Sequence, residues 1–245
     1  MSFERFRFVT FEGPEGAGKT TQAKRLCKRL EETGFQVLLT REPGGTALGR
    51  AIRELVLSDS GLDITPRAET LLYCAARAQL VERALLPALA DGKVVVLDRY
   101  ADSTLAYQGY GRGLDIQGVR EVLEFATSGL RPGLSFLLDL PVETGLNRKR
   151  AQRTSGTAEE WNRFESEDLA FHERIRQAYL DLARAEPIRW RVVDASSRLE
   201  EVADEVWRYY QEVCDELVVL NHDRFSGYLS GTEQSPLGTG YFSGE

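Results

Sequence analysis

The feature that most constrains this chain is the stretch GPEGAGKT, which begins one residue after the short apolar segment RFVTF near the N-terminus. It matches the pattern G-x-x-x-x-G-K-T through Gly13, Gly18, Lys19 and Thr20. Glycines let backbone N–H groups approach a phosphate closely, and the start of a following helix adds a positive electrostatic end. Lys19 can reach the transferring phosphates, and the Thr20 hydroxyl can bind Mg²⁺. The sequence therefore predicts a strand, a loop for nucleotide phosphates and a helix.

Two kinds of segment alternate along the rest of the chain. Short apolar segments rich in Val, Leu and Phe are predicted as strands, several of them buried on both faces: 7–11, 35–40, 93–98, 134–140 and 188–195. Longer patterns are predicted as helices: from the glycine loop to Gly34, 66–92 with a break or kink at Pro87, 115–129, 165–186 and 197–217. This alternation indicates an α/β fold with a mainly parallel sheet.

The composition excludes several classes of protein. A run of about 18 apolar residues is absent, so no membrane span is expected, and the charged start MSFERFRF predicts no secretory segment. A net charge of -7 disfavours broad nucleic-acid binding. The cysteines Cys27, Cys74 and Cys214 are odd in number and far apart, and His172 and His222 are isolated. A disulfide framework and a zinc cluster are therefore unexpected, and a reducing cytoplasm fits.

A carboxylate ends one of the predicted buried strands. Asp98 follows the apolar run VVVL, and ligands of parallel α/β sheets bind at the carboxyl ends of the strands. Asp98 can hold Mg²⁺ there, directly or through water. Taken alone, a strand-end aspartate that only begins a turn is the simpler interpretation, but the nearby phosphate loop favours the metal site.

Further motifs narrow the reaction. The stretch REPGG offers Arg41 to an anion, and LLYCAARAQ places Tyr73 and Arg77 on one helix face. The stretch DRYADSTLAYQGYGRG supplies more polar groups. Singly, these residues read as core, solvated charge or turn. Together and in this order with the glycine loop, they resemble the thymidylate kinase family, over about residues 6–213.

This resemblance implies an activity and a fold. The implied reaction moves the γ-phosphate of ATP to dTMP, giving dTDP and ADP for dTTP synthesis, with Mg²⁺ as cofactor. The implied fold is the P-loop NTP hydrolase-like three-layer fold, a five-stranded parallel sheet flanked by helices, usually assembled as a homodimer. Catalytic roles fall on Lys19, Arg99, Arg153 and Glu15, and metal binding on Thr20 and Asp98. ATP binding falls on Gly13, Pro14, Glu15, Gly16, Ala17, Gly18, Lys19, Thr20, Thr21, Arg148 and Arg150.

The resemblance also implies a dTMP site made of Glu15, Arg41, Tyr73, Arg77, Arg99, Ser103, Thr104, Tyr107 and Gln108. Tyr73 takes the place of the ring that stacks on thymine, where the family more often has Phe, and Arg77 bonds the thymine edge. Arg41 and Arg99 bind the acceptor phosphate. Tyr107 crowds the sugar 2′ position, and Glu15 lies by the 3′-hydroxyl.

A basic run, RKRAQR, lies in the segment 147–165 that the resemblance makes a flexible lid. Some thymidylate kinases carry a loop arginine at the position that is Gly16 here, so the lid arginines must supply that charge, in the bacterial-type arrangement. Arg153 is the candidate to reach the phosphates. A solvated helix face is the alternative for this run. The lid ends NRFE where the family usually shows DRFE, so Asn162 lacks a carboxylate.

The kinase domain is predicted over residues 1–217. Residues 218–245 are predicted as a flexible C-terminal tail, because the end of the chain is rich in Gly and Ser and has no hydrophobic period. Three alternatives to the implied function stay open. A kinase for another acceptor such as dUMP is one, since a methyl group discriminates by only about 1–3 kcal/mol. A GTPase-like switch lacks support because no N-K-x-D element is present. A catalytically inactive nucleotide-binding module conflicts with the intact Lys19 and Asp98.

Overall fold

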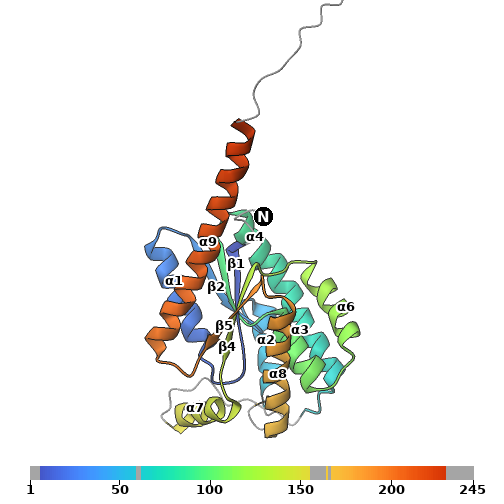
Figure 1. Ribbon diagram of the computed structural model, residues 1–245. Coiled ribbons are helices and arrows are strands. Elements are labelled where there is room, and N and C mark those ends of the chain that lie inside the picture. The colour runs from blue at the N-terminus through green and yellow to red at the C-terminus, as the bar shows by residue number, and fades with distance from the viewer. Residues whose placement is uncertain (1–5, 59–61, 155–163, 165–166, 230–245) are drawn as a thin grey trace, which may run out of the picture.

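The computed structural model describes the backbone of residues 6–58, 62–154, 164 and 167–229, and the side chains of these ranges up to residue 214. Five strands form one parallel sheet in the order β2-β3-β1-β4-β5 (Figure 1). Their bounds are β1 Phe8–Glu12, β2 Val37–Arg41, β3 Val94–Asp98, β4 Leu134–Asp139 and β5 Trp190–Asp194. The predicted α/β class and all five predicted strands are confirmed.

Helices cover both faces of the sheet, with α1 and α9 on one side and α3, α6 and α8 on the other (Figure 1). The α-helices are α1 Lys19–Glu32, α2 Ala47–Leu57, α3 Pro66–Leu80, α4 Leu86–Ala90, α5 Ala101–Thr104, α6 Ile116–Thr127, α7 Val142–Thr154, α8 Leu169–Ala185 and α9 Leu199–Leu229. Two wider π-helical segments are η2 Val81–Leu85 and η3 Leu105–Gly111. The chain therefore has the expected three layers.

The predicted break at Pro87 takes the form of a local widening. The helix α3 passes into the π-helical segment Val81–Leu85 and then into α4, so the backbone stays helical across 66–90. Proline has no N–H to donate, and its ring crowds the carbonyl four residues earlier, here that of Arg83. A wider turn relieves that contact without ending the helix.

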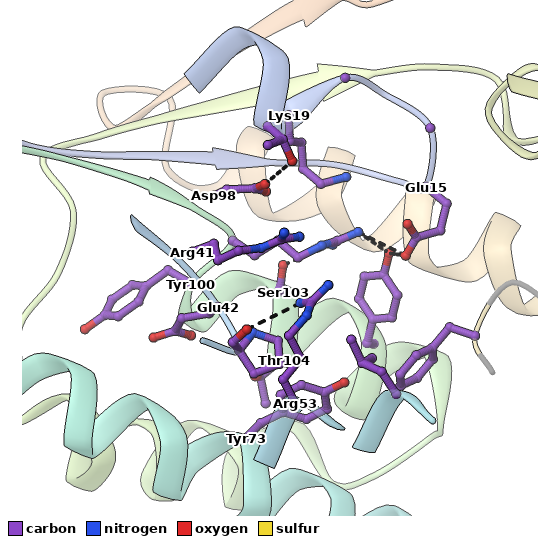
Figure 2. A pocket seen from close by; sticks show the side chains of 18 of the residues that line it. Glu15, Lys19, Arg41, Glu42, Arg53, Tyr73, Asp98, Tyr100, Ser103 and Thr104 are labelled. Carbon is purple, nitrogen blue, oxygen red and sulfur yellow. Dashed lines mark hydrogen bonds and ion pairs between the residues drawn. The ribbon is translucent and has the colours of Figure 1, made fainter. Parts of the chain in front are cut away.

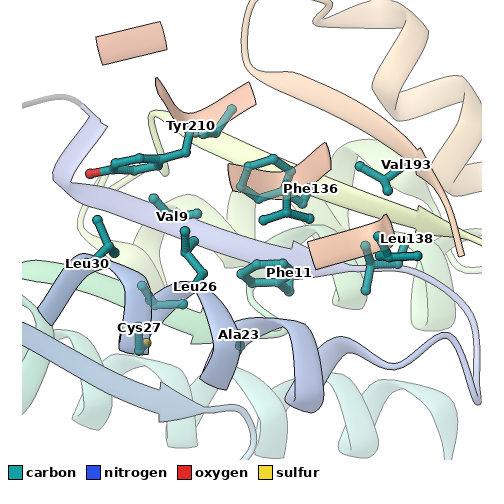
Figure 3. Close-up of a cluster of buried hydrophobic side chains, with 14 of the residues drawn as sticks. Val9, Phe11, Ala23, Leu26, Cys27, Leu30, Phe136, Leu138, Val193 and Tyr210 are labelled. Carbon is teal, nitrogen blue, oxygen red and sulfur yellow. The ribbon is translucent and has the colours of Figure 1, made fainter. Parts of the chain in front are cut away.

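The core between the sheet and the helices α1 and α9 follows from strand and helix periodicity. Val9 and Phe11 of β1 point to this face, while Phe8 packs in a cluster on the other. Leu26 and Leu30, one turn apart on α1, pack on the same cluster, which Figure 3 shows together with Phe136, Leu138, Val193 and Tyr210. Burying each such side chain contributes about 1.5–3 kcal/mol. This packing fixes the sheet edge from which the glycine loop begins.

The last helix departs from the prediction. The sequence predicts that it ends near residue 217, but α9 continues to Leu229, so the predicted end of this helix is wrong. Residues 218–226 contain neither Pro nor Gly, and extending an existing helix adds one hydrogen bond for each residue fixed. Residues 230–245 lie outside the described residues. None of the helices in the described ranges is both long and apolar enough to cross a membrane.

Candidate active site

The glycine loop connects β1 to α1 at the carboxyl edge of the sheet. Gly13 and Gly16 have φ values of 135° and 72°, which a residue with a side chain rarely adopts. Lys19 is 7% exposed. Its Nζ donates to the carbonyl oxygens of Gly13 at 3.1 Å and Pro14 at 2.7 Å. Burial lowers the pKa of Lys19 to about 8, and the loop carbonyls hold its amino group in place.

The same two loop glycines are crowded by neighbouring backbone. A Cβ at Gly13 would lie 2.5 Å from the carbonyl oxygen of Leu138, and one at Gly16 would lie 2.2 Å from that of Gly145 in α7. In turn, a Cβ at Gly145 would lie 2.1 Å from the carbonyl oxygen of Glu15. The close packing of α7 on the loop therefore leaves no room for an arginine at position 16, which gives the missing loop arginine a steric reason.

The two predicted metal ligands lie next to each other. The Thr20 hydroxyl donates to the Asp98 carboxylate, joining the start of α1 to the end of β3. Both supply oxygen atoms, the ligands that Mg²⁺ prefers, and Mg²⁺ needs few protein groups when substrate phosphates and water complete its shell. Within the described ranges, no three His, Cys, Asp or Glu side chains gather as a cation site. The pair thus fits Mg²⁺ held jointly with a phosphate substrate.

Arg99 is the centre of a partly buried polar network, and its backbone φ of 68° lies in the left-handed region. Its Nη1 donates to Ser103 Oγ and to the Tyr179 hydroxyl, each at 3.3 Å. Its Nη2 donates to Glu15 Oε1 and to the Tyr107 hydroxyl, each at 3.0 Å. Burial opposes ionisation of Glu15, but positive charge, first that of Arg99, lowers its pKa to about 2. Glu15 is therefore a carboxylate at neutral pH.

A second buried cluster lies beside this network (Figure 2). Arg77 is 2% exposed. Its Nε donates to Glu42 Oε2 at 2.8 Å and its Nη1 to Thr104 Oγ1 at 3.0 Å. Gln108 Nε2 donates to Glu69 Oε1 at 2.7 Å. These bonds hold Arg77 and Gln108 as fixed groups in the cavity wall rather than as mobile arms.

A cavity of about 490 Å³ joins the loop, the Arg99 network and the Arg77 cluster. This volume suits a small-molecule site. The predicted site residues that line it are Glu15, Gly16, Gly18, Lys19, Thr20, Thr21, Arg41, Tyr73, Arg77, Asp98, Arg99, Ser103, Thr104, Tyr107 and Gln108. Gly13, Pro14 and Ala17 do not line the cavity, although the carbonyl oxygens of Gly13 and Pro14 accept hydrogen bonds from Lys19. The predicted ATP loop and dTMP site thus meet in one space.

The predicted lid arginines lie elsewhere. Arg148 donates from Nη1 to the carbonyl oxygen of Ala195 at 2.9 Å, after β5. Arg150 and Arg153 are exposed on α7, and none of the three lines the cavity. The part of the lid up to Thr154 is helical. Asn162 lies outside the described residues.

Other residues line the cavity that the sequence did not single out. Lys149 and Gln152 of α7 lie on it in place of the arginines, and their spacing of three in the basic run was a usable signal of a shared helix face. Glu42 also lines the cavity, and it directly follows Arg41 in the stretch REPGG. Arg53 of α2 also lines the cavity, and no local pattern marks it.

Comparisons with known proteins identify the family of this chain. The family profile described as thymidylate kinase matches residues 11–206. The thymidylate kinase of Thermomicrobium roseum is 53% identical over 206 residues, covering 84% of this chain and 95% of the relative. That of Syntrophotalea carbinolica is 52% identical over 207 residues, covering 84% and 94%. The crystal structure of thymidylate kinase from Ehrlichia chaffeensis superposes with a TM-score of 0.66 at 32% identity, covering 83% and 97%. The chain belongs to the thymidylate kinase family.

Proposed function

We propose that this chain transfers the γ-phosphate of ATP to dTMP, forming dTDP and ADP. One observation carries the proposal: a single cavity contains both the Lys19 loop and the Arg99 network. Phosphoryl transfer requires two anionic substrates to be aligned and their charge to be neutralised. The cationic side chains on the cavity wall supply the positive charge that neutralises the substrates. Glu15 belongs to the glycine loop and contacts Arg99, so it joins the loop to the Arg99 network.

The roles of the residues follow from their positions. Lys19 and the loop N–H groups hold the phosphates of ATP, while Arg99 and Arg41 hold the phosphate of dTMP. The acceptor oxygen is already ionised, so the reaction needs no general base. Tyr73 stacks on the base, and the fixed Arg77 forms hydrogen bonds with the edge of the base. The rest of the pocket consists of Thr104, Ser103, Tyr107 and Gln108.

Mg²⁺ is the proposed cofactor. Thr20 and Asp98 would hold it, directly or through water, beside the loop that binds phosphates. When bound, the cation neutralises the negative charge that gathers on the transferring phosphate. The chain's own groups orient the two substrates.

The test of the function is an ADP-release assay with ATP, Mg²⁺ and a panel of dTMP, dUMP, dCMP, dGMP and AMP. We expect kcat/KM to be highest for dTMP, with dUMP as a weak substrate because it lacks only one methyl group. Preference for another monophosphate would discard the base-pocket roles and keep the kinase. ATP binding without acceptor-dependent turnover would reject the proposal.

Two basic residues of α7, Arg153 and Lys149, are candidates for the positive charge that the glycine loop lacks. Lys149 lines the cavity and Arg153 does not, so a pair of variants is needed to distinguish them. In the proposed bacterial-type arrangement, Arg153→Ala lowers kcat by about 100-fold and leaves the Kd for dTMP within about twofold, because one transition-state charge contact is lost. The measurement is steady-state kinetics together with titration of dTMP by calorimetry. Lys149→Ala is the matched variant. A loss of kcat in that variant alone would assign the charge to Lys149 and remove Arg153 from catalysis.

A homodimer is the proposed assembly. The neighbouring helices α2, α3 and α6 form one side of the molecule (Figure 1), and each carries exposed apolar side chains: Leu48 and Leu55, Leu71, and Phe125. Phe125 is 88% exposed, which is unusual for a phenylalanine unless a partner covers it.

We therefore expect Phe125→Asp to weaken dimerisation by about 30-fold, the effect of losing an aromatic interface residue worth about 2 kcal/mol. Light scattering over a dilution series measures the change. Leu199→Asp on α9, across the sheet, is the control and should leave the assembly unchanged. Equal dimer stability in both variants would place the interface elsewhere.

The proposed location is the cytoplasm, and the proposed kinase domain is 1–217 with 218–245 appended to it. In the described part of the chain, Cys27, Cys74 and Cys214 are not joined in disulfides, which suits a reducing compartment. The helix α9 packs on the core through Val206, Tyr210 and Val213, which places this part of the helix within the proposed kinase domain.

A further inference from the structure

Glu12 ends β1 immediately before the glycine loop, and its side chain is completely buried at 0% exposure. Its Oε1 accepts a hydrogen bond from the backbone N–H of Tyr100 at 2.8 Å. Its Oε2 accepts from Ser103 Oγ at 2.6 Å and from the Tyr179 hydroxyl at 3.2 Å. A buried carboxylate is costly unless such bonds compensate it. All three donors surround Arg99, which suggests why the chain keeps a carboxylate here.

The first connection to Arg99 runs through side chains. Ser103 and Tyr179 both accept from Arg99 Nη1 at 3.3 Å, and their oxygens lie 2.7 Å apart. Each hydroxyl has a single hydrogen to donate. Whichever way the two hydroxyls bond to each other, at least one hydrogen ends on Glu12. The carboxylate thereby turns hydroxyl lone pairs toward the guanidinium.

The second connection runs through the backbone. Arg99 has a φ of 68°, and its own N–H donates to the carbonyl oxygen of Phe11 at 3.0 Å. The next N–H, that of Tyr100, donates to Glu12. A residue with a side chain keeps such a conformation only where its surroundings enforce it. Phe11 and Glu12, adjacent at the end of β1, enforce it here on both sides of Arg99.

We propose that Glu12 is a positioning residue for phosphoryl transfer, which holds the Arg99 guanidinium at the acceptor phosphate through both its backbone and its side chain. The role rests on the proposed function of Arg99. Glu12 itself contacts no substrate. Burial, together with the nearby Asp102, raises the pKa of Glu12 to about 7. Three hydrogen bonds donated to Glu12 compensate part of the cost of burying it there, as a positioning role requires.

The test is Glu12→Gln, which keeps the shape and replaces one acceptor by an N–H₂ donor. That group would face either the Tyr100 N–H or the two hydroxyls, whose hydrogens would then turn toward Arg99. We expect KM for dTMP to rise about tenfold and kcat to fall about tenfold, since small displacements of a positioning group cost up to 100-fold. KM for ATP should change less than about twofold, because Lys19 is held by the carbonyl oxygens of Gly13 and Pro14 and not by Glu12.

Tyr179→Phe is the second variant and removes one hydroxyl without changing the carboxylate. It should raise KM for dTMP several-fold on its own and add little to Glu12→Gln, because both act on Arg99 through the same bonds. Should Glu12→Gln fail to fold, this single variant still decides. An unchanged kcat/KM for dTMP, or equal losses for ATP and dTMP, would overturn the proposal.

The proposed function and the role of Glu12 can fail separately. If the wild-type protein prefers another monophosphate, the function fails, and the same comparison of KM for acceptor and for ATP then tests Glu12 with that acceptor. If dTMP is the substrate and the variants show no acceptor-specific loss, only the role of Glu12 fails.

Discussion

Lys19→Met is expected to lower kcat by about 1,000-fold while the protein stays folded. Methionine has a similar length but no charge, so the transferring phosphate loses a cation in a buried place where a charge is worth most. The amino group of Lys19 lies at the loop carbonyls of Gly13 and Pro14, not at a core contact. Steady-state kinetics with ATP and dTMP measures kcat, and calorimetry should find the Kd for dTMP within about threefold of wild type.

Lys24→Met is the matched control for this experiment. Lys24 belongs to the same helix and lines the same cavity, but its side chain is exposed. Water already screens an exposed charge, so we expect its removal to change kcat less than about threefold. Equal losses in both variants would mean that general electrostatics, not the contact made by Lys19, drives catalysis. A kcat for Lys19→Met within tenfold of wild type would reject the proposed role.

The phosphate loop was predictable because its parts are consecutive. Gly13, Gly16 and Lys19 act within one turn of chain, so their spacing in the sequence is already their arrangement in space. The strands were predictable for a related reason, since burial on both faces requires uninterrupted apolar residues. The order of the strands in the sheet was not, because it depends on contacts between distant segments.

The charged residues of the core could not be predicted either, because they too depend on contacts between distant segments. Glu12 looks like the polar end of a strand until Tyr179, far along the chain, is placed against it. Glu42 looks like one more loop residue until Arg77 is seen to be buried with it. The helix α2 is missing from the prediction, although its buried residues Ile52 and Val56 lie four residues apart, as on one helix face. Local patterns thus locate the site, while its supporting charges depend on the tertiary fold.

Arg77→Met is expected to lower the free energy of unfolding by about 3–5 kcal/mol, the cost of removing one partner of a buried ion pair. Arg77 Nη2 lies 2.6 Å from Glu42 Oε2, and the two side chains are only 2% and 5% exposed. Burial raises the pKa of Glu42 even though the charge of Arg77 opposes it. Urea denaturation of wild type and variant measures the loss, and a difference below about 1 kcal/mol would contradict the buried pair.

The pH dependence of that loss follows from Glu42. Without Arg77, burial favours the protonated carboxyl, so the folded variant holds a proton that the unfolded chain releases at neutral pH. A group whose pKa is raised in the folded state destabilises that state as pH rises. The deficit of Arg77→Met relative to wild type should therefore shrink as the pH falls from neutral toward the ordinary pKa of a glutamate. A deficit independent of pH would assign the loss to packing.

The double variant Arg77→Met/Glu42→Leu separates stability from recognition. Removing both charges together leaves no unpaired ion, so most of the stability lost in Arg77→Met should return. Binding should not return with it, because the base edge then meets no guanidinium. A hydrogen bond to a charged group is worth about 1.5–3 kcal/mol, so KM for dTMP should stay raised by about 10- to 100-fold while KM for ATP is unchanged. A stable double variant that binds dTMP like wild type would show that Arg77 supports the pocket wall and does not read the base.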